Sequence, residues 1–520
     1  MSPAGTGPVD DRAPILVGLG ELSAKPGTTP AGPVPEFMAR AVRAAALDAA
    51  GIDPGDGTAD LPPLAAALID AVELVAVAPS ATWPDHDPGR SVAHALGIDH
   101  ARTMRSSMVG GNGSQLLVNE LAARIQAGAL DVAVMCGAEA LHSEQTSFES
   151  FGDAVNQAQH GAGEVLEEDH PGNSEAELEV GFALPVLGYA LMEQAIGVAA
   201  GRTTSEQQHV AAELWSRFSE VASEHPNAWV QGARTADEIA TPTAANRQVT
   251  YPYTKLMTAN FRVDEAGALL LCSVDAARRL GIDESRWVYV HAGAQANDEW
   301  FVSNRTSLDR SPAIRAIGEA LFAHADITAA ELGPVDLYSC FPSAVQIAAR
   351  ELGLPIDDPG RPLTRTGGLT FFGGPGNNFG THGVIGVARD LRGAAPGTLG
   401  ISSSLGWYAT KHAYGLFGTS APARPYETLR PTPEPARREV ASAEDASAPD
   451  AGAVVECATA FFGRDGAPEF GVVFAILQDG RRAIGKITQA DVLGKLTSDG
   501  FIGTPIELLS DRTVTINNAR

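Results

Sequence analysis

The sequence predicts an α/β protein of two related halves, followed by a small all-β domain. Short, continuously apolar segments alternate with amphipathic, Ala-rich segments, as in parallel sheets that are covered by helices. The same order of segments recurs later in the chain, which indicates an internal duplication. After a stretch rich in Pro, Ala and acidic residues, the pattern changes to short strands separated by turn residues.

The first half contains strands and helices in alternation. Residues 13–21, "APILVGLGE", form an apolar run typical of a buried strand, and residues 35–52 form an Ala-rich amphipathic helix. A second strand is expected at 71–79. The stretch "SSMVGGNGSQLLVNELAARI" at 106–125 begins with small residues and continues as an amphipathic run, which predicts a tight turn leading into a helix. A further buried strand follows at 130–141.

The second half repeats this order. Residues 287–298 correspond to the first strand and residues 311–327 to the first long helix. Residues 334–354, "PVDLYSCFPSAVQIAARELGL", form a strand, a small-residue turn and an amphipathic helix, like the stretch that contains the glycine turn. A closing strand pair is expected at 396–418. Between the halves, residues 142–250 turn polar and acidic, which predicts an inserted region where substrate contacts are common.

The tail of the chain predicts a linker and an additional domain. The linker is rich in Pro, Ala and acidic residues, so we expect it to be flexible and to be cut first by a protease. The short strands beyond it predict an independently folded, barrel-like β domain. The predicted units are the first half at 1–141, the inserted region at 142–250, the second half at 251–420, the linker at 421–451 and the β domain at 452–520.

Composition excludes several classes of protein. The net charge of −26 argues against binding to nucleic acid or to an anionic membrane surface, because both need a basic surface. The four cysteines lie far apart, so neither structural zinc nor a disulfide framework is expected. The N-terminus lacks the pattern of a signal peptide, and the most apolar stretch, 180–192, is too short to span a bilayer. We expect a soluble, cytoplasmic protein, and the Ala, Gly and Arg bias suggests a bacterial source.

Local motifs between residues 12 and 420 resemble the thiolase superfamily, nearest its sterol-carrier type. The stretch "LPVLGYALMEQAIGVAAGRTTSEQQHVAAELWSRFSEVASEHPNAW" is similar to the thiolase segment in which a tyrosine-bearing helix precedes a Gly-Thr turn, an acidic helix and an Asn-Pro-Ala close. "SCFPSAVQIAARELGL" resembles the helix after the His-Asp-Cys-Phe motif, and "TGGLTFFGGPGNNFGTHG" resembles the Gly-His-Pro loop. In the first stretch, the matching residues are Tyr189, Gly201, Thr203, Pro226 and Ala228.

The additional C-terminal domain resembles that of thiolase-like proteins of type 1. The resemblance implies a five-layered αβαβα fold built from two duplicated halves. It also implies an acyltransferase of the acetyl-CoA acetyltransferase kind, in acyl-CoA and lipid metabolism, with a CoA thioester as candidate ligand, no other cofactor and no metal. It further implies a monomer or a homodimer.

The residues that carry thiolase chemistry are changed in this chain. A thiolase needs a cysteine nucleophile, a histidine that activates it, a second cysteine as acid or base, and an oxyanion hole. Carried over by the resemblance, the nucleophile falls at Gly110, the histidine of the Gly-His-Pro loop at Gly374 and the second cysteine at Gly400. The Asn or His of the third motif becomes Tyr338. We therefore expect no ordinary thiolysis.

Tyr338 is the candidate catalytic residue that remains, because a phenol can donate a proton or polarise a carbonyl. The resemblance to thiolase-like retro-aldolases, which use tyrosine, implies a lyase acting on acyl-CoA side chains. The alternative, which we favour, is a buried tyrosine whose hydroxyl is hydrogen-bonded to the backbone. In that case Phe371, Phe372 or Trp407 fills the space left by the missing side chains at Gly110 and Gly374. Further candidates for the pocket lining are Ser339, Cys340, Ser403 and Trp407.

Three functions remain open from the sequence. The first is a protein that binds an acyl or CoA ligand without thiolysis. The second is an acyl-CoA retro-aldolase that uses Tyr338. The third is a non-catalytic scaffold that acts through its C-terminal β domain.

Overall fold

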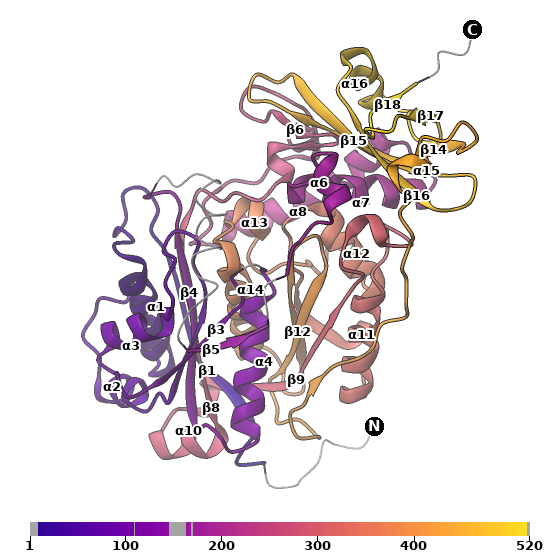
Figure 1. Cartoon of the computed structure of the whole chain (residues 1–520). Coiled ribbons are helices and arrows are strands. Elements are labelled where there is room, and N and C mark those ends of the chain that lie inside the picture. The colour runs from indigo at the N-terminus through magenta and orange to yellow at the C-terminus, as the bar shows by residue number, and fades with distance from the viewer. Residues whose placement is uncertain (1–8, 109, 145–162, 168–169, 517–520) are drawn as a thin grey trace.

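One long mixed β-sheet joins the two halves of the molecule (Figure 1). The computed structural model describes residues 9–108, 110–144, 163–167 and 170–516. The strand order is β10-β11-β12-β9-β1-β8-β4-β2-β3-β5. The first half supplies β1 (Pro14–Ser23), β2 (Leu74–Ala78), β3 (Arg102–Ser106) and β4 (Val132–Ala140). These strands pair with β5 (Glu164–Leu166), which lies in the sequence of the inserted region, and with β8 (Asp264–Ser273), which lies beyond the boundary predicted at 251. The second half supplies β9 (Val288–Asn297), β10 (Leu332–Asp336), β11 (Leu399–Gly406) and β12 (Lys411–Gly418).

The helices form three layers around the two parts of this sheet. Helix α1 (Val34–Ala49), with α2 (Pro63–Asp70) and α3 (Pro88–Leu96) beside it, covers the outer face of the first half. The helices α11 (Pro312–Ala325) and α12 (Pro342–Leu352) cover the second half. The central helices α4 (Gly113–Gln126) and α14 (Phe379–Arg392) each contact strands of both halves (Figure 1). The five-layered αβαβα fold implied by the resemblance is confirmed.

The inserted region lies over the C-terminal β domain and α12. It contains α6 (Glu175–Glu179), α7 (Pro185–Ala199), α8 (Thr204–Glu224), α9 (Ala236–Ala240), β6 (Gln248–Thr250) and β7 (Tyr253–Thr254). Helix α8 starts with a capping box, in which the side chains of Thr203 and Glu206 each bond the other's backbone N–H. Helix α7 packs against α12 and β14, so it connects the second half to the C-terminal domain.

The C-terminal domain is built on a second, antiparallel sheet. Its elements are β14 (Ala453–Phe462), β15 (Pro468–Ile476), β16 (Arg482–Ile487), α16 (Ala490–Leu496), β17 (Pro505–Leu508) and β18 (Val514–Thr515). The sheet also includes strands of the inserted region, because β6 pairs with β14 through Thr250 and Phe461 and with β7. Cys457, Val472 and Phe474 belong to the same hydrophobic core as the second half. The domain therefore packs closely on the rest of the protein.

The segment between the second half and this domain is docked, and the expectation of a flexible linker is wrong. Strand β13 (Thr428–Leu429) pairs with β9, and the hydroxyl of buried Tyr426 donates to the backbone oxygen of Asn119 over 3.0 Å. The backbone of Val440 forms an isolated β-bridge with the backbone of Arg482 in β16. Composition predicted flexibility because few large apolar residues are present, but these few are the ones that pack.

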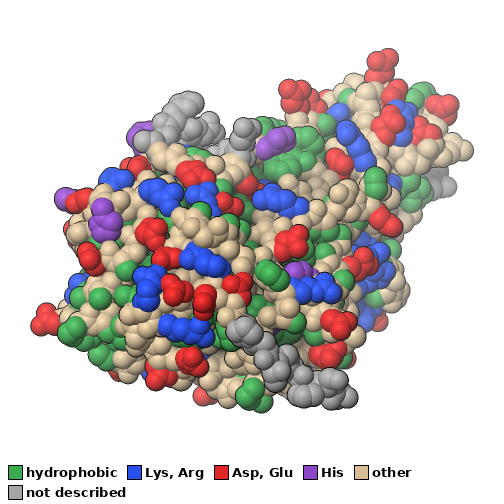
Figure 2. Space-filling view, turned by 90° about the horizontal axis from the view of Figure 1, so that it is seen from below, with side chains coloured by type: hydrophobic (Ala, Val, Ile, Leu, Met, Phe, Trp, Pro, Cys, Tyr) green, Lys and Arg blue, Asp and Glu red, His purple; other side chains and the backbone are tan. Residues whose placement is uncertain are grey.

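Figure 2 shows one face of the molecule, on which acidic and basic side chains are interspersed. Among the side chains drawn in colour there, the basic ones form no continuous area, in line with the net charge of −26. Within the described ranges, no helix combines the length and the apolar character needed to cross a bilayer.

Candidate functional site

The glycine turn before α4 meets the hairpin turn between β11 and β12 at the centre of the molecule. Gly110 has φ +141°, in the region that favours glycine, and a side chain at Gly406 would lie 3.0 Å from the Cα of Gly110. The turn belongs to the first half and the hairpin to the second, so the fold brings together loops from both halves. This is the place where the resemblance puts the thiolase nucleophile.

Lys411 fills the space beside Gly110. A Cβ atom built on Gly110 would lie 2.8 Å from both Cε and Nζ of Lys411, and would also collide with the side-chain oxygen of Asn112. Since heavy atoms cannot approach so closely, a cysteine at this position would have to displace the lysine. A cationic amine thus occupies the volume where a thiolase has its thiol.

Lys411 is held by polar groups from the first half. Its side chain is 4% exposed, and Nζ lies 3.0 Å from Oε2 of Glu167 and 3.2 Å from Oγ of Ser107. The same carboxylate oxygen accepts a hydrogen bond of 3.0 Å from Nδ2 of Asn112. Glu167 itself has φ +65°, a strained conformation for a residue with a side chain. Sequence reasoning missed both residues.

Tyr338 follows β10 and precedes α12, where the sequence placed it. Its backbone N–H donates to Oγ of Ser403 over 2.9 Å, and its hydroxyl lies so close to Gly111 that a side chain there would collide with it. None of the hydrogen bonds among the described residues involves this hydroxyl, so the expected backbone cap is not found. Burial, and then the charge that Cys340 would carry, raises the pKa of Tyr338 well above its ordinary value. The residue is 7% exposed.

Three further candidates surround Tyr338. Ser403 supports its backbone, as described above. The thiol of Cys340 is buried, which raises its pKa to about 12, and it lies within hydrogen-bonding reach of Tyr189. Ser339 is fully buried and its hydroxyl, without a partner among the described residues, faces Gly368. A thiol with so high a pKa is not a nucleophile at neutral pH.

Trp407 lies at the tip of the hairpin, away from Tyr338. Its φ is +58° and that of Ala409 is +52°, so this turn is strained. Tyr189 fixes the turn, because its hydroxyl donates to the backbone oxygen of Trp407 and accepts from the N–H of Ala409, both over 2.9 Å. The indole ring of Trp407 packs against Gly172 of the inserted region.

Phenylalanine rings pack beside Tyr338. Phe371 and Phe372 are fully buried. The ring of Phe372 packs against Phe379, with centroids 6.3 Å apart, and the ring of Phe379 meets Tyr338 edge-on at 5.2 Å. Phe379, which the sequence analysis did not name, thus lies between Phe372 and Tyr338.

The Gly373–Gly374 loop lies against a buried carboxyl group. A Cβ atom on Gly374 would lie 3.3 Å from the backbone oxygen of Asn260, so little room exists where thiolases have their histidine. Gly373 lies so close to the carboxyl group of Glu265 on β8 that a Cβ atom at this position would collide with it. Both oxygens of Glu265 are buried and lack a hydrogen-bond partner among the described residues. Burial, then the charge of Glu21, raises the pKa of Glu265 well above its usual range.

The neighbouring carboxylate, Glu21 of β1, is fully paired. His382 Nδ1 lies 3.0 Å from one of its oxygens, Arg389 Nη2 lies 3.1 Å from the other, and His225 lies 3.5 Å away. Burial alone would raise the pKa of Glu21, but His225, Arg389 and His382 hold it well below the ordinary value. The ring of His382 is therefore engaged with Glu21 and does not replace the histidine missing at Gly374.

Gly400 is not part of this site, which corrects the assignment of the second cysteine position. It lies inside β11, where a Cβ atom would come within 2.8 Å of Pro334 and 2.9 Å of Val387 on α14. The run "GISSSLG" belongs to the closing strand pair expected at 396–418, and it forms strand β11 up to Gly406. Gly406 is the residue of this strand that reaches Gly110.

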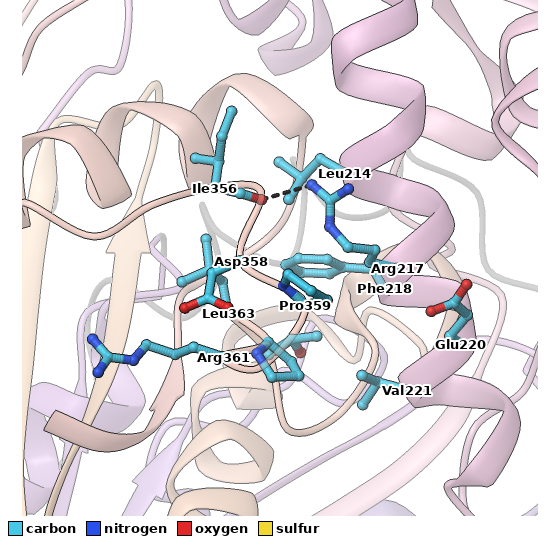
Figure 3. Close-up of a pocket in the computed structure, with 12 residues that line it drawn as sticks. Leu214, Arg217, Phe218, Glu220, Val221, Ile356, Asp358, Pro359, Arg361 and Leu363 are labelled. Atoms are coloured by element: carbon cyan, nitrogen blue, oxygen red, sulfur yellow. Dashed lines mark hydrogen bonds between the residues drawn. The ribbon is translucent and has the colours of Figure 1, made fainter. Parts of the chain in front are cut away.

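Two pockets among the described residues bear on the search for a site. One, of about 390 Å³, opens beside the Lys411–Glu167 ion pair. The other, of about 90 Å³, lies between α8 and residues 356–364 (Figure 3). Its walls are mainly apolar, and Arg217 donates to the backbone oxygen of Ile356 over 2.6 Å across it. The larger pocket is the one beside the site, because Glu167, the ion-pair partner of Lys411, lines it. The larger pocket is lined by Leu116, Glu120, Leu166, Glu167, Gln295, Ala296, Asn297 and Arg430.

Comparisons with known proteins agree with this fold. No protein-family model and no curated protein matches the chain. Among solved structures, the chain is 27% identical to a monomeric SCP2-thiolase-like protein type 1 from Mycobacterium smegmatis, with a TM-score of 0.77 over 98% of this chain and 100% of that one. The Ltp2–ChsH2(DUF35) aldolase has a TM-score of 0.55 at 18% identity, over 78% of this chain and 98% of that one. The Acat5 thiolase from Ascaris suum, in complex with coenzyme A, has a TM-score of 0.51 at 14% identity, over 78% and 99%.

Proposed function

The chain is a member of the thiolase superfamily, of the sterol-carrier-type thiolase-like group, and from this premise we propose that it binds an acyl-CoA or related acyl ligand without thiolysis. The observation that carries this proposal is the replacement of the expected cysteine nucleophile by a glycine at the turn before α4. Gly110 has no side chain, and the amine of Lys411 fills the adjacent space. Thiolysis proceeds through an acyl-cysteine, and no thiol is available at this turn. The complex of a thiolase of the same fold with coenzyme A supports the choice of ligand.

We predict that the protein binds acyl-CoA but does not cleave acetoacetyl-CoA. Isothermal titration with CoA, acyl-CoAs and hydroxyacyl-CoAs measures the first property, and release of acetyl-CoA measures the second. The variant Gly110→Cys is also expected to lack thiolysis, because the new side chain meets Lys411 and no histidine stands at Gly374. Absence of binding to every CoA compound would refute the proposal, and thiolysis by the unmodified protein would show that the nucleophile lies elsewhere.

An acyl-CoA retro-aldolase is the second candidate, and the hydroxyl of Tyr338 favours it. This hydroxyl forms no hydrogen bond with the described residues and lies beside the nucleophile turn. Cleavage of a β-hydroxyacyl-CoA needs a group that removes the hydroxyl proton and one that stabilises the enolate. The aldolase of the same fold supports this candidate.

The variant Tyr338→Phe is expected to leave the stability almost unchanged, because no hydrogen bond is lost, and to abolish cleavage of a hydroxyacyl-CoA. Thermal unfolding and a cleavage assay measure the two effects. Tyr253→Phe is the matched control: its hydroxyl lies 2.7 Å from Glu193 and 2.9 Å from Ser343, so we expect a loss of about 1 kcal/mol. A similar loss for Tyr338→Phe, with no change in cleavage, would leave Tyr338 a purely structural role.

A further inference from the structure

The side chain of Lys411 is the reactive group that the thiolase comparison does not account for. It comes from β12 of the second half, reaches the glycine turn of the first half, and lies beside Gly110 and Ser107. Burying an ammonium group costs free energy unless it is paired, and here Glu167 pairs with it at 3.0 Å. The fold thus keeps an amine at the point where the related enzymes keep their nucleophile.

The choice of lysine over arginine indicates that the amine itself matters. The chain has only five lysines among its 37 basic residues. Other ion pairs use arginine as the cation, for example at Asp48, Glu351 and Glu456. Arginine suits a structural ion pair, but it does not lose its proton in proteins. Lysine can lose its proton, and its neutral amine is a nucleophile.

Glu167 is placed to take that proton. Its Oε2 receives both the ammonium of Lys411 and the amide of Asn112. A quarter of its side chain is exposed, whereas Lys411 is almost fully covered. The carboxylate therefore stands between the amine and solvent, where it can accept a proton from one side and release it to the other.

A pocket gives access to this pair. Glu167 lines the pocket of about 390 Å³, and so does Asn297, which lies directly opposite Lys411 in the pairing of β9 with β12. The volume falls within the range of about 300–1,000 Å³ that is usual for small-molecule sites. A ligand in this pocket therefore lies beside the carboxylate that pairs with the amine of Lys411.

We propose that Lys411 is a nucleophile that forms an imine with a ketone or aldehyde bound in this pocket. Glu167 takes a proton from the ammonium, and the freed nitrogen lone pair attacks the carbonyl carbon. The carbonyl π electrons move to oxygen, which takes one proton from the now positively charged nitrogen to give a neutral carbinolamine. The C–O bond then breaks as the proton from Glu167 completes a water molecule, and the nitrogen lone pair forms the C=N bond. An ammonium and a carbonyl thus become an iminium and water, without any oxidant or reductant. This activity does not depend on the binding of acyl-CoA.

Reductive trapping on the full-length protein tests the proposal. Butanone or benzaldehyde is added with sodium cyanoborohydride, which converts an iminium into a stable secondary amine. Intact mass spectrometry is expected to show one adduct per chain, and peptide mapping is expected to place it on Lys411 before the other four lysines react. The same reaction in urea gives the labelling pattern of the unfolded chain as a reference.

Two variants serve as a matched pair. Lys411→Arg keeps the positive charge but has no nucleophilic amine, so the specific adduct is expected to be lost. Lys255→Arg changes an exposed lysine and should retain the adduct. Because mapping is done on the unmodified protein, the result does not depend on whether the Lys411 variant folds. Labelling spread evenly over Lys25, Lys255, Lys486 and Lys495, or folded protein unlabelled at Lys411, would overturn the proposal.

Discussion

Replacement of Arg482 by methionine is expected to lower the free energy of unfolding by about 3 kcal/mol and to loosen the C-terminal domain. The guanidinium is fully buried and binds Glu456 with two hydrogen bonds, of 2.7 and 2.8 Å. Its remaining nitrogen donates to the backbone oxygens of Ser303 and Arg305 in the second half. The side chain of Arg482 therefore joins the C-terminal domain to the second half. Its loss leaves the carboxylate of Glu456 and two backbone carbonyls with fewer hydrogen-bond partners.

Chemical denaturation and limited proteolysis measure the effect of this change. The unmodified protein should unfold as a unit that includes residues 421–452, whereas Arg482→Met should show earlier cleavage there, because Val440 pairs with Arg482 itself. Arg481→Met is the control, since the neighbouring side chain makes its ion pairs at the surface with Asp445 and Asp479 and should matter little. Equal effects of the two variants would contradict the role given to Arg482.

Glu265→Gln is expected to stabilise the protein increasingly as the pH rises above about 4.5. Burial raises the pKa of Glu265 well above the ordinary value of 4.5. Below that value the carboxyl is protonated in both states and has no effect. Above it, the unfolded chain ionises while the folded protein does not, so the folded state loses about 1.4 kcal/mol per pH unit until its own pKa is reached. Glutamine does not ionise and escapes this loss.

Unfolding free energies measured between pH 5 and pH 8 test this prediction. Glu139 is the matched control, because it lies directly opposite Glu265 in the pairing of β4 with β8. Its carboxylate accepts hydrogen bonds from Ser80, from the N–H of Ala81 and from Thr82, at 2.7–3.1 Å. Glu139→Gln puts an amide against these donors and should destabilise by about 2 kcal/mol. A difference between Glu265→Gln and the unmodified protein that stays constant with pH would show that Glu265 is not protonated in the fold.

The order and type of the main elements follow from local pattern. The helix expected at 35–52 is observed as Val34–Ala49, and the strand expected at 13–21 as Pro14–Ser23. In both segments the pattern of apolar residues is visible within the segment itself, without reference to distant parts of the chain. The docking of residues 421–452 could not be predicted in this way, because it depends on single residues, such as Tyr426, whose partners lie far away in the chain. Composition averages over such residues and therefore indicated a free linker.

The candidate site was predictable only in part, for the same reason. The resemblance supplied Gly110 and Tyr338, each in a stretch whose local pattern predicts a strand, a turn and a helix. Lys411 lies within the closing strand pair, where a polar residue among buried ones gives no sign of its partner, and its neighbours Gly110 and Glu167 come from the other half. The resemblance placed the second cysteine at Gly400, but this residue lies inside β11, and Gly406 at the end of the same strand is the one that reaches Gly110.

The pairing of β6 with β14 also bears on how the protein is made. Thr250 bonds to Thr459, 209 positions later, so the inserted region cannot complete its sheet until the last domain has left the ribosome. Contacts so distant in sequence form slowly, because a long loop must close before they are gained. A nascent chain that stops before residue 453 exposes β6 as an open edge, which is a template for association with other chains. The inserted region is therefore synthesised before the second half, yet it is among the last parts to finish folding.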